Sequence, residues 1–143
     1  MAKIRNASDE KMKINANRAR EDTAVEYPSF SFLHLTHSKK RTYEFFGKNK
    51  GEMKAMSHNL HLYLITASKK SWQQWFIEGH KTAGLETVSK SSFEDDCIRG
   101  DAPDDLLVAR FGPDNKYRMI GYKSKSIFFI TAFDFDFSAY DHG

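Results

Sequence analysis

The sequence predicts an α+β fold in which one strand is followed by a pair of helices and then by three or four antiparallel strands. Three observations predict it. An alternating apolar segment occupies 29–36, apolar residues recur at three- and four-residue spacing over 49–78, and turn signals separate short apolar runs over 85–135. The chain of 143 residues suits one domain at 27–143, preceded by a basic extension at 1–26.

The extension has few apolar residues, so we expect it to be mobile or helical and to lie outside the core. Its stretch "SDEKMKINANRAR" can form a helix with Ser8 as N-cap. Residues 1–50 hold eleven Lys or Arg against six Asp or Glu. This charge suits an anionic partner such as RNA, DNA or an acidic protein, but a solvated arm fits it equally well.

The segment "SFSFLHLT" at 29–36 has Phe on one side and Leu on the other, which predicts a central strand. The two helices that follow are predicted to begin after the N-caps Asn49 and Ser71. Their short connection predicts an antiparallel helical hairpin packed on a sheet.

The rest of the chain predicts β-structure. We expect a weak strand at 85–93, an acidic loop, a strand at 105–111, a turn at 112–115, and a hairpin formed by 116–125 and 126–135. Together these elements predict an antiparallel meander of three to four strands.

Several classes of protein and site are disfavoured. No secretory apolar segment and no apolar run of roughly 20 residues is present, so we expect a cytoplasmic protein without a membrane span. No metal or phosphate-loop motif stands out, and we expect no cofactor; His58 and His61 share a helix face but are interpreted as ordinary surface residues. Cys97 lies among carboxylates, which raise a thiol pKa and argue against a nucleophile.

The end of the chain alternates Phe and Asp in "AFDFDFSAYDHG". Asp134 and Asp136 lie on one face of a strand and would suit a divalent cation. We favour a structural interpretation, in which the aspartates face water and the alternating Phe residues face the core. These residues are Phe133, Phe135 and Phe137.

Cationic and aromatic residues gather on the predicted hairpin and on the strand before it. Single-stranded RNA is bound by surfaces that neutralise phosphates and stack unpaired bases on aromatic rings. A solvated sheet face explains the same residues about equally well. The residues concerned are Arg110, Arg118, Tyr122, Lys123 and Lys125.

The element order, with "KYRMIGY" feeding "SIFFITAFDFDFSAYD", resembles the RelE/ParE toxin superfamily over about residues 29–142. The resemblance implies a toxin that is held by a cognate antitoxin. On the RelE branch it implies a metal-independent endoribonuclease that cleaves mRNA, typically on the ribosome, through attack of a 2′-OH on the adjacent phosphodiester. The ParE branch resembles a gyrase inhibitor, so the alternative is a non-catalytic inhibitor that binds a host enzyme.

The resemblance also implies roles for individual residues. Arg118 and Arg110 would contact phosphate, Tyr140 would act as a general base or stacking group, and His142 as the acid. The residues placed to bind RNA are Tyr122, Lys123 and Lys125.

Overall fold

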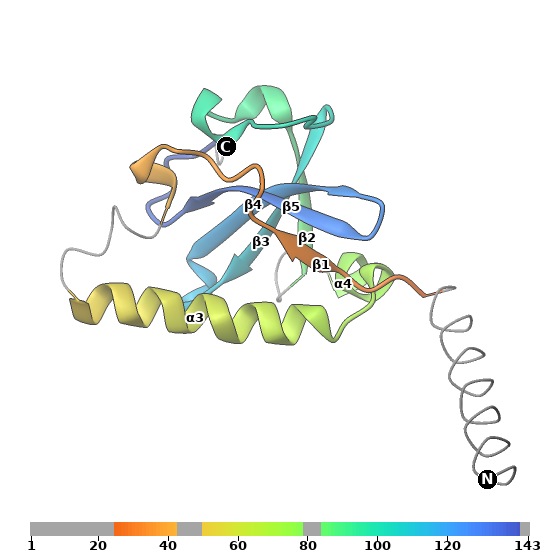
Figure 1. Cartoon of the computed structure of the whole chain (residues 1–143), viewed down its shortest axis with the longest axis horizontal. Coiled ribbons are helices and arrows are strands. Elements are labelled where there is room, and N and C mark those ends of the chain that lie inside the picture. Colours follow the sequence, from red (N-terminus) through yellow and green to blue (C-terminus); the bar gives the residue numbers. More distant parts are fainter. Residues whose placement is uncertain (1–24, 43–49, 79–83, 141–143) are drawn as a thin grey trace, which may run out of the picture.

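The computed structural model describes residues 25–42, 50–78 and 84–140. These residues form an α+β fold built on one mixed five-stranded sheet (Figure 1). The strands are β1 (Ser29–Ser31), β2 (Leu85–Ser89), β3 (Asp105–Phe111), β4 (Tyr117–Ser124) and β5 (Ile127–Asp134). The α-helices are α3 (Lys50–Ser68) and α4 (Trp72–Glu78). Short 3₁₀ helices are η1 (Lys39–Arg41), η2 (Lys90–Ser92), η3 (Asp95–Cys97) and η4 (Pro113–Asn115).

The strand order is β1-β5-β4-β3-β2. Strands β2 to β5 pair antiparallel in sequence order, which confirms the predicted meander. The prediction that the first strand is central is wrong, because β1 has only three residues and lies at the sheet edge, parallel to β5. The strand stops where Ser31 Oγ accepts a hydrogen bond from the Leu33 backbone N–H, a local turn that alternation of apolar residues does not reveal.

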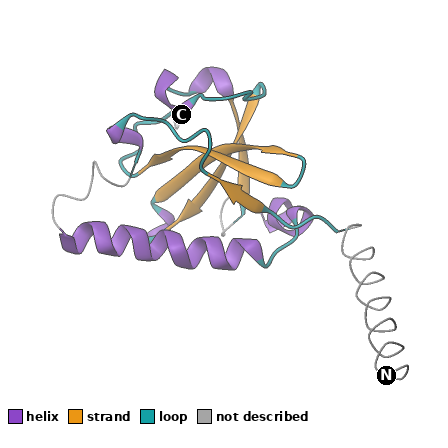
Figure 2. Cartoon of the chain, viewed as in Figure 1, coloured by secondary structure: helices purple, strands orange, loops and turns teal. Residues whose placement is uncertain are grey.

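Helices α3 and α4 cover one face of the sheet, as Figure 2 shows. Ser71 caps α4 as predicted, because its Oγ accepts a hydrogen bond from the Gln74 N–H at 3.1 Å. The fully buried Trp75 links the two helices, since its indole Nε1 donates to the Tyr63 hydroxyl at 3.1 Å. The predicted N-cap Asn49 lies outside the described residues.

The opposite face of the sheet is buried as well. The connection between β2 and β3 and the segment after β5 cover it with a second apolar cluster, in which Phe93 and Tyr140 pair through an isolated bridge. Burial on both faces explains why β3 reads as a nearly continuous apolar run rather than an alternating one. The polar side chains of interest lie on this second face, at its margins.

Most of the basic extension, residues 1–24, lies outside the described residues. Glu26 contacts the folded domain, because its carbonyl accepts a hydrogen bond from the Trp72 N–H at 2.9 Å. No helix in the described ranges is long and apolar enough to cross a membrane.

Candidate functional site

Two arginines face each other on adjacent inner strands of the sheet, near the turn that joins β3 to β4. Arg110 on β3 is in direct register with Arg118 on β4, so both side chains project from the face opposite the helices. Glu86 on β2 projects from the same face, and its Oε2 lies 3.6 Å from Arg110 Nη2. Three adjacent strands therefore place two guanidinium groups and one carboxylate together.

The fourth member of this cluster comes from the end of the described chain. Tyr140 packs its ring on Phe93, with ring centroids 4.9 Å apart. Burial raises the pKa of the Tyr140 phenol and the charge of Glu86 adds to this, whereas Arg118 and Arg110 oppose it. The phenol therefore stays protonated at neutral pH, which suits a hydrogen-bond donor rather than the general base implied by the family resemblance.

The two arginines carry more donors than the protein satisfies. Like charges directly opposite across strands are unfavourable. Glu86 lies beside Arg110, and the buried Asp134 on β5 is in direct register with Arg118, so each arginine has one carboxylate on a neighbouring strand. The Nε atoms of Arg110 and Arg118 are buried, and neither has a hydrogen-bond partner within the described part of the chain. Arg118 Nη1 donates to the carbonyls of Asn115 and Lys116, at 3.2 and 2.7 Å. An anion with several oxygens could accept hydrogen bonds from these Nε donors, because guanidinium groups bind carboxylate and phosphate through paired hydrogen bonds.

Access to the cluster is uneven. Arg118 is 4% exposed and Tyr140 is 8% exposed. The side chains of Arg110 and Glu86 are each 28% exposed. A ligand arriving from solvent would therefore touch Arg110 and Glu86 first, and Arg118 would support them from behind.

The other residues predicted to bind RNA do not lie together in the structure. Tyr122 projects from the same face as Arg118 but lies four residues along β4, at about 13 Å. Lys123 projects from the helix side, where its Nζ lies 3.2 Å from a Glu26 carboxylate oxygen and 5.4 Å from the Trp72 ring centroid. Lys125 lies in the exposed turn between β4 and β5. His142 lies outside the described residues.

The structural interpretation of the Phe–Asp alternation is partly wrong. Asp134 is 1% exposed, because its carboxylate accepts hydrogen bonds from the backbone N–H groups of Asp136, Ser138 and Ala139, each at 3.2 Å. It stabilises the turn after β5 instead of facing water. Phe137 does not face the core: it is 47% exposed, and the Arg118 guanidinium carbon lies 4.7 Å from its ring centroid. Asp136 is exposed, as predicted. The described residues contain no group of three potential metal-ligating side chains.

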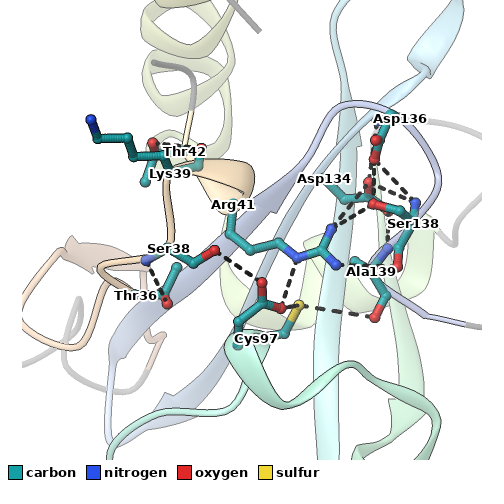
Figure 3. A network of polar contacts seen from close by, with 11 residues as sticks. Thr36, Ser38, Lys39, Arg41, Thr42, Cys97, Asp134, Asp136, Ser138 and Ala139 are labelled. Carbon is teal, nitrogen blue, oxygen red and sulfur yellow. Dashed lines mark hydrogen bonds and ion pairs between the residues drawn. The ribbon is translucent and has the colours of Figure 1, made fainter. Parts of the chain in front are cut away.

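Sequence patterns did not predict the buried polar network around Arg41 (Figure 3). Arg41 is 1% exposed, and its Nε donates to Asp96 Oδ1 at 2.9 Å. Its Nη1 donates to Ser138 Oγ at 2.8 Å and lies 3.9 Å from Asp134 Oδ1. Three segments far apart in the sequence are thus joined: η1, η3 and the turn after β5. The donors of Arg41 are used within the protein, so this network is a structural clamp.

Cys97 lies beside the clamp and is fully buried. Burial raises the pKa of its thiol to about 12, and the neighbouring carboxylates of Asp96 and Asp134 contribute in the same direction. At neutral pH the group is therefore a protonated thiol. The pKa is raised, as predicted from the neighbouring carboxylates, although burial is the larger cause.

The clamp predicts a specific sensitivity to acid. Burial alone would raise the pKa of Asp96, but hydrogen bonds from Arg41 and Ser38 outweigh it, and the pKa lies below its usual value. A carboxyl with a lowered pKa in the folded state contributes stability that is present above its unfolded pKa of about 4 and is lost as the pH falls through the folded value. We therefore expect the stability difference between the wild type and Asp96→Asn to be largest near neutral pH and to shrink below about pH 4.

Urea unfolding at a series of pH values measures this difference. Asp95→Asn is the matched control, because Asp95 is an exposed neighbour on the same 3₁₀ helix. A difference between the wild type and Asp96→Asn that stays constant from neutral pH to pH 3 would contradict the prediction.

No protein-family model, curated protein or solved structure matches this chain. The fold and the site define this chain as an α+β protein. Its candidate site is the partly buried pair Arg110 and Arg118, together with the Glu86 carboxylate and the Tyr140 phenol.

Proposed function

We propose that this chain is a RelE/ParE-like toxin that cleaves RNA without a metal ion. The direct opposition of Arg110 and Arg118, beside Glu86 and Tyr140, carries the proposal. The element order of one strand, two helices and an antiparallel meander is compatible with the same family resemblance.

The cluster offers the groups that phosphodiester cleavage by a neighbouring 2′-OH requires. The reaction needs a base for the 2′-OH proton, positive charge on the phosphorane and a donor for the leaving 5′-oxygen. Glu86 supplies an acceptor for the proton, a role that sequence reasoning missed because a lone Glu in a weak strand carries no signal. Arg110 is the principal phosphate contact because it is more exposed than Arg118.

Tyr140 and Arg118 complete the proposed site from the buried side. The protonated phenol of Tyr140 donates a hydrogen bond to a phosphoryl or leaving-group oxygen. Arg118 adds positive charge and positions the cluster through its bonds to the carbonyls before β4. His142 keeps the role of a second acid that the resemblance implies.

The proposed substrate and partner follow from the same resemblance. The proposed substrate is mRNA on the ribosome, so the protein would act in the cytoplasm. A cognate antitoxin would hold the protein inactive. The exposed Lys125 and the partly exposed Arg110 would contact the RNA backbone.

A second candidate function is a protein-binding inhibitor without catalysis. It is favoured by large apolar side chains that are exposed around β1 and α4. The most exposed are Leu33 and Ile77, each at 76%, and Phe32 at 49%. Such a surface suits contact with a host enzyme or with the antitoxin.

Incubation of the purified full chain with total cellular RNA in the presence of EDTA tests the first proposal. We expect RNA fragments whose 3′ ends carry a 2′,3′-cyclic phosphate, because the attacking group is the neighbouring 2′-OH. Induction of the chain in cells should arrest growth and shorten transcripts. Growth arrest without RNA fragments, in vitro or in cells, would exclude cleavage and favour the protein-binding inhibitor.

A further inference from the structure

A cavity lies on the same sheet face as the arginine pair, at the other end of β4. Its volume is about 230 Å³. Segments from three regions form it: the turn after β1, the connection between β2 and β3, and the β4–β5 hairpin. The lining residues are His34, Asp101, Pro103, Tyr122, Lys123, Ser124 and Phe129.

Three aromatic rings make one wall of this cavity. The Tyr122 and Phe129 rings are stacked, with centroids 5.3 Å apart and an interplanar angle of 24°. The His34 ring stacks at 22° to Tyr122 and its centroid lies 5.2 Å from that of Phe129. A wall of this kind suits a flat aromatic ligand, which would extend the stack.

The backbone at Gly100 is pressed against this wall. Gly100 has φ of +63°, a conformation that side chains rarely adopt. A Cβ there would lie 2.6 Å from Tyr122 Oη and 2.8 Å from His34 Cγ. Because Gly100 has no Cβ, the backbone can approach the rings closely, and this places the next residue, Asp101, at the edge of the aromatic wall.

One carboxylate lines the cavity, that of Asp101. Asp101 is exposed and makes no hydrogen bond or ion pair with any other residue that the structure describes. Its carboxylate can accept two parallel N–H donors. Lys123 also lines the cavity, but its ammonium group lies beside Glu26 and Trp72, so it does not neutralise Asp101.

We propose that this cavity binds one unpaired base of single-stranded RNA, with a preference for guanine. The aromatic wall accepts the face of the base, and the Asp101 carboxylate accepts hydrogen bonds from the adjacent N1–H and N2–H groups of guanine. Adenine and cytosine offer only an amino donor beside an acceptor nitrogen, and uracil a single N–H between two carbonyls, so each pairs less well with a carboxylate.

The position of the cavity connects it to the proposed cleavage site, and this connection rests on the proposed function. Tyr122 and Arg118 lie on one face of β4, about 13 Å apart. Extended single-stranded RNA can place a base in the cavity and a phosphate a few nucleotides away at Arg110. Lys125 follows Ser124 at the cavity rim, on the side away from Arg118, and would contact the RNA backbone that flanks the bound base. The cavity would then select the sequence that is cut.

Guanosine, which lacks phosphate, tests base binding independently of the arginine pair. We would titrate the ¹⁵N-labelled full chain with guanosine, adenosine, cytidine and uridine and follow the amide signals of Gly100, Asp101 and Ser124. Guanosine should shift these signals and bind at least fivefold more tightly than uridine. Asp101→Asn should weaken guanosine binding about tenfold, through loss of charged hydrogen bonds. Because Asp101 is exposed, this variant should fold normally.

His34→Ala should also weaken guanosine binding about tenfold through lost stacking, and a thermal unfolding scan checks its fold. Asp104→Asn is the matched control, because it removes an exposed carboxylate from the same connection but outside the cavity lining, and should leave guanosine binding unchanged. Absence of guanosine binding, equal binding of uridine, or full binding by Asp101→Asn would overturn the proposal.

The RNA assay separates this inference from the proposed function. RNA cleavage without guanosine binding would overturn the base pocket alone. Guanosine binding without RNA cleavage would support the pocket and overturn the nuclease.

Discussion

Arg110→Gln is expected to reduce the rate of RNA cleavage by about a hundred- to a thousandfold. This is the usual effect of removing one preorganised donor that stabilises a developing negative charge. Arg110 is the sharper test of the site than Arg118. Arg118 is 4% exposed and bonds two backbone carbonyls, so its loss would also disturb the turn before β4. The Arg110 side chain is 28% exposed and its ion-pair partner, Glu86, is equally exposed.

The measurement is the initial rate of cleavage of a defined RNA by each purified variant. Lys116→Gln is the matched control, because it removes one exposed positive charge from the adjacent turn and should change the rate less than threefold. Glu86→Gln should reduce the rate by a factor of about a hundred or more, since a neutral amide cannot accept the 2′-OH proton. If Arg110→Gln and Lys116→Gln cleave equally well, Arg110 does not stabilise the transition state.

Arg41→Gln is expected to lower the free energy of unfolding by about 3–5 kcal/mol, the usual cost of removing one partner from a buried ion pair. Arg41 is 1% exposed and joins three segments through Asp96 and Ser138. Burial alone would lower the pKa of the guanidinium, but its hydrogen bond to Asp96 and the nearby negative charges raise it. Its loss leaves the buried carboxylate of Asp134 without the guanidinium group that lies 3.9 Å from it.

Urea unfolding at neutral pH measures this change. Lys40→Gln is the control, because Lys40 precedes Arg41 in the same 3₁₀ helix but is exposed. A double-mutant cycle with Asp96→Asn isolates the coupling between the two charged groups, which should be large because they are in direct contact. A loss below 1 kcal/mol for Arg41→Gln would show that the clamp does not stabilise the domain.

Local patterns predicted much of the fold. The boundaries of β3 match the prediction at 105–111, and Ser71 caps α4, because both depend on residues that are close in sequence. The first strand was placed wrongly in the centre of the sheet. The position of β1 in the sheet is set by its pairing with β5, whose residues lie almost a hundred positions away in the sequence.

The sequence predicted the candidate site only in part, because long-range pairing brings its residues together. Arg110, Arg118 and Tyr140 were singled out as separate residues, and the structure brings them together through the β3–β4 register and the fold of the chain after β5. Glu86 and Asp101 were not singled out, because each is an ordinary acidic residue in its own segment. Their positions beside Arg110 and beside the aromatic wall arise only from long-range packing.

The α+β class and the antiparallel meander follow from the sequence alone, since periodicity and turn residues are local properties. The neighbouring carboxylates predicted the direction of the Cys97 pKa shift, but its main cause is burial. Which charged residues are buried depends on the packing of the whole domain. Arg41 and Lys40 are adjacent basic residues, yet one is 1% exposed and the other faces solvent. A buried charge is tolerated only where it has partners, and for Arg41 these partners come from segments that are far away in the sequence.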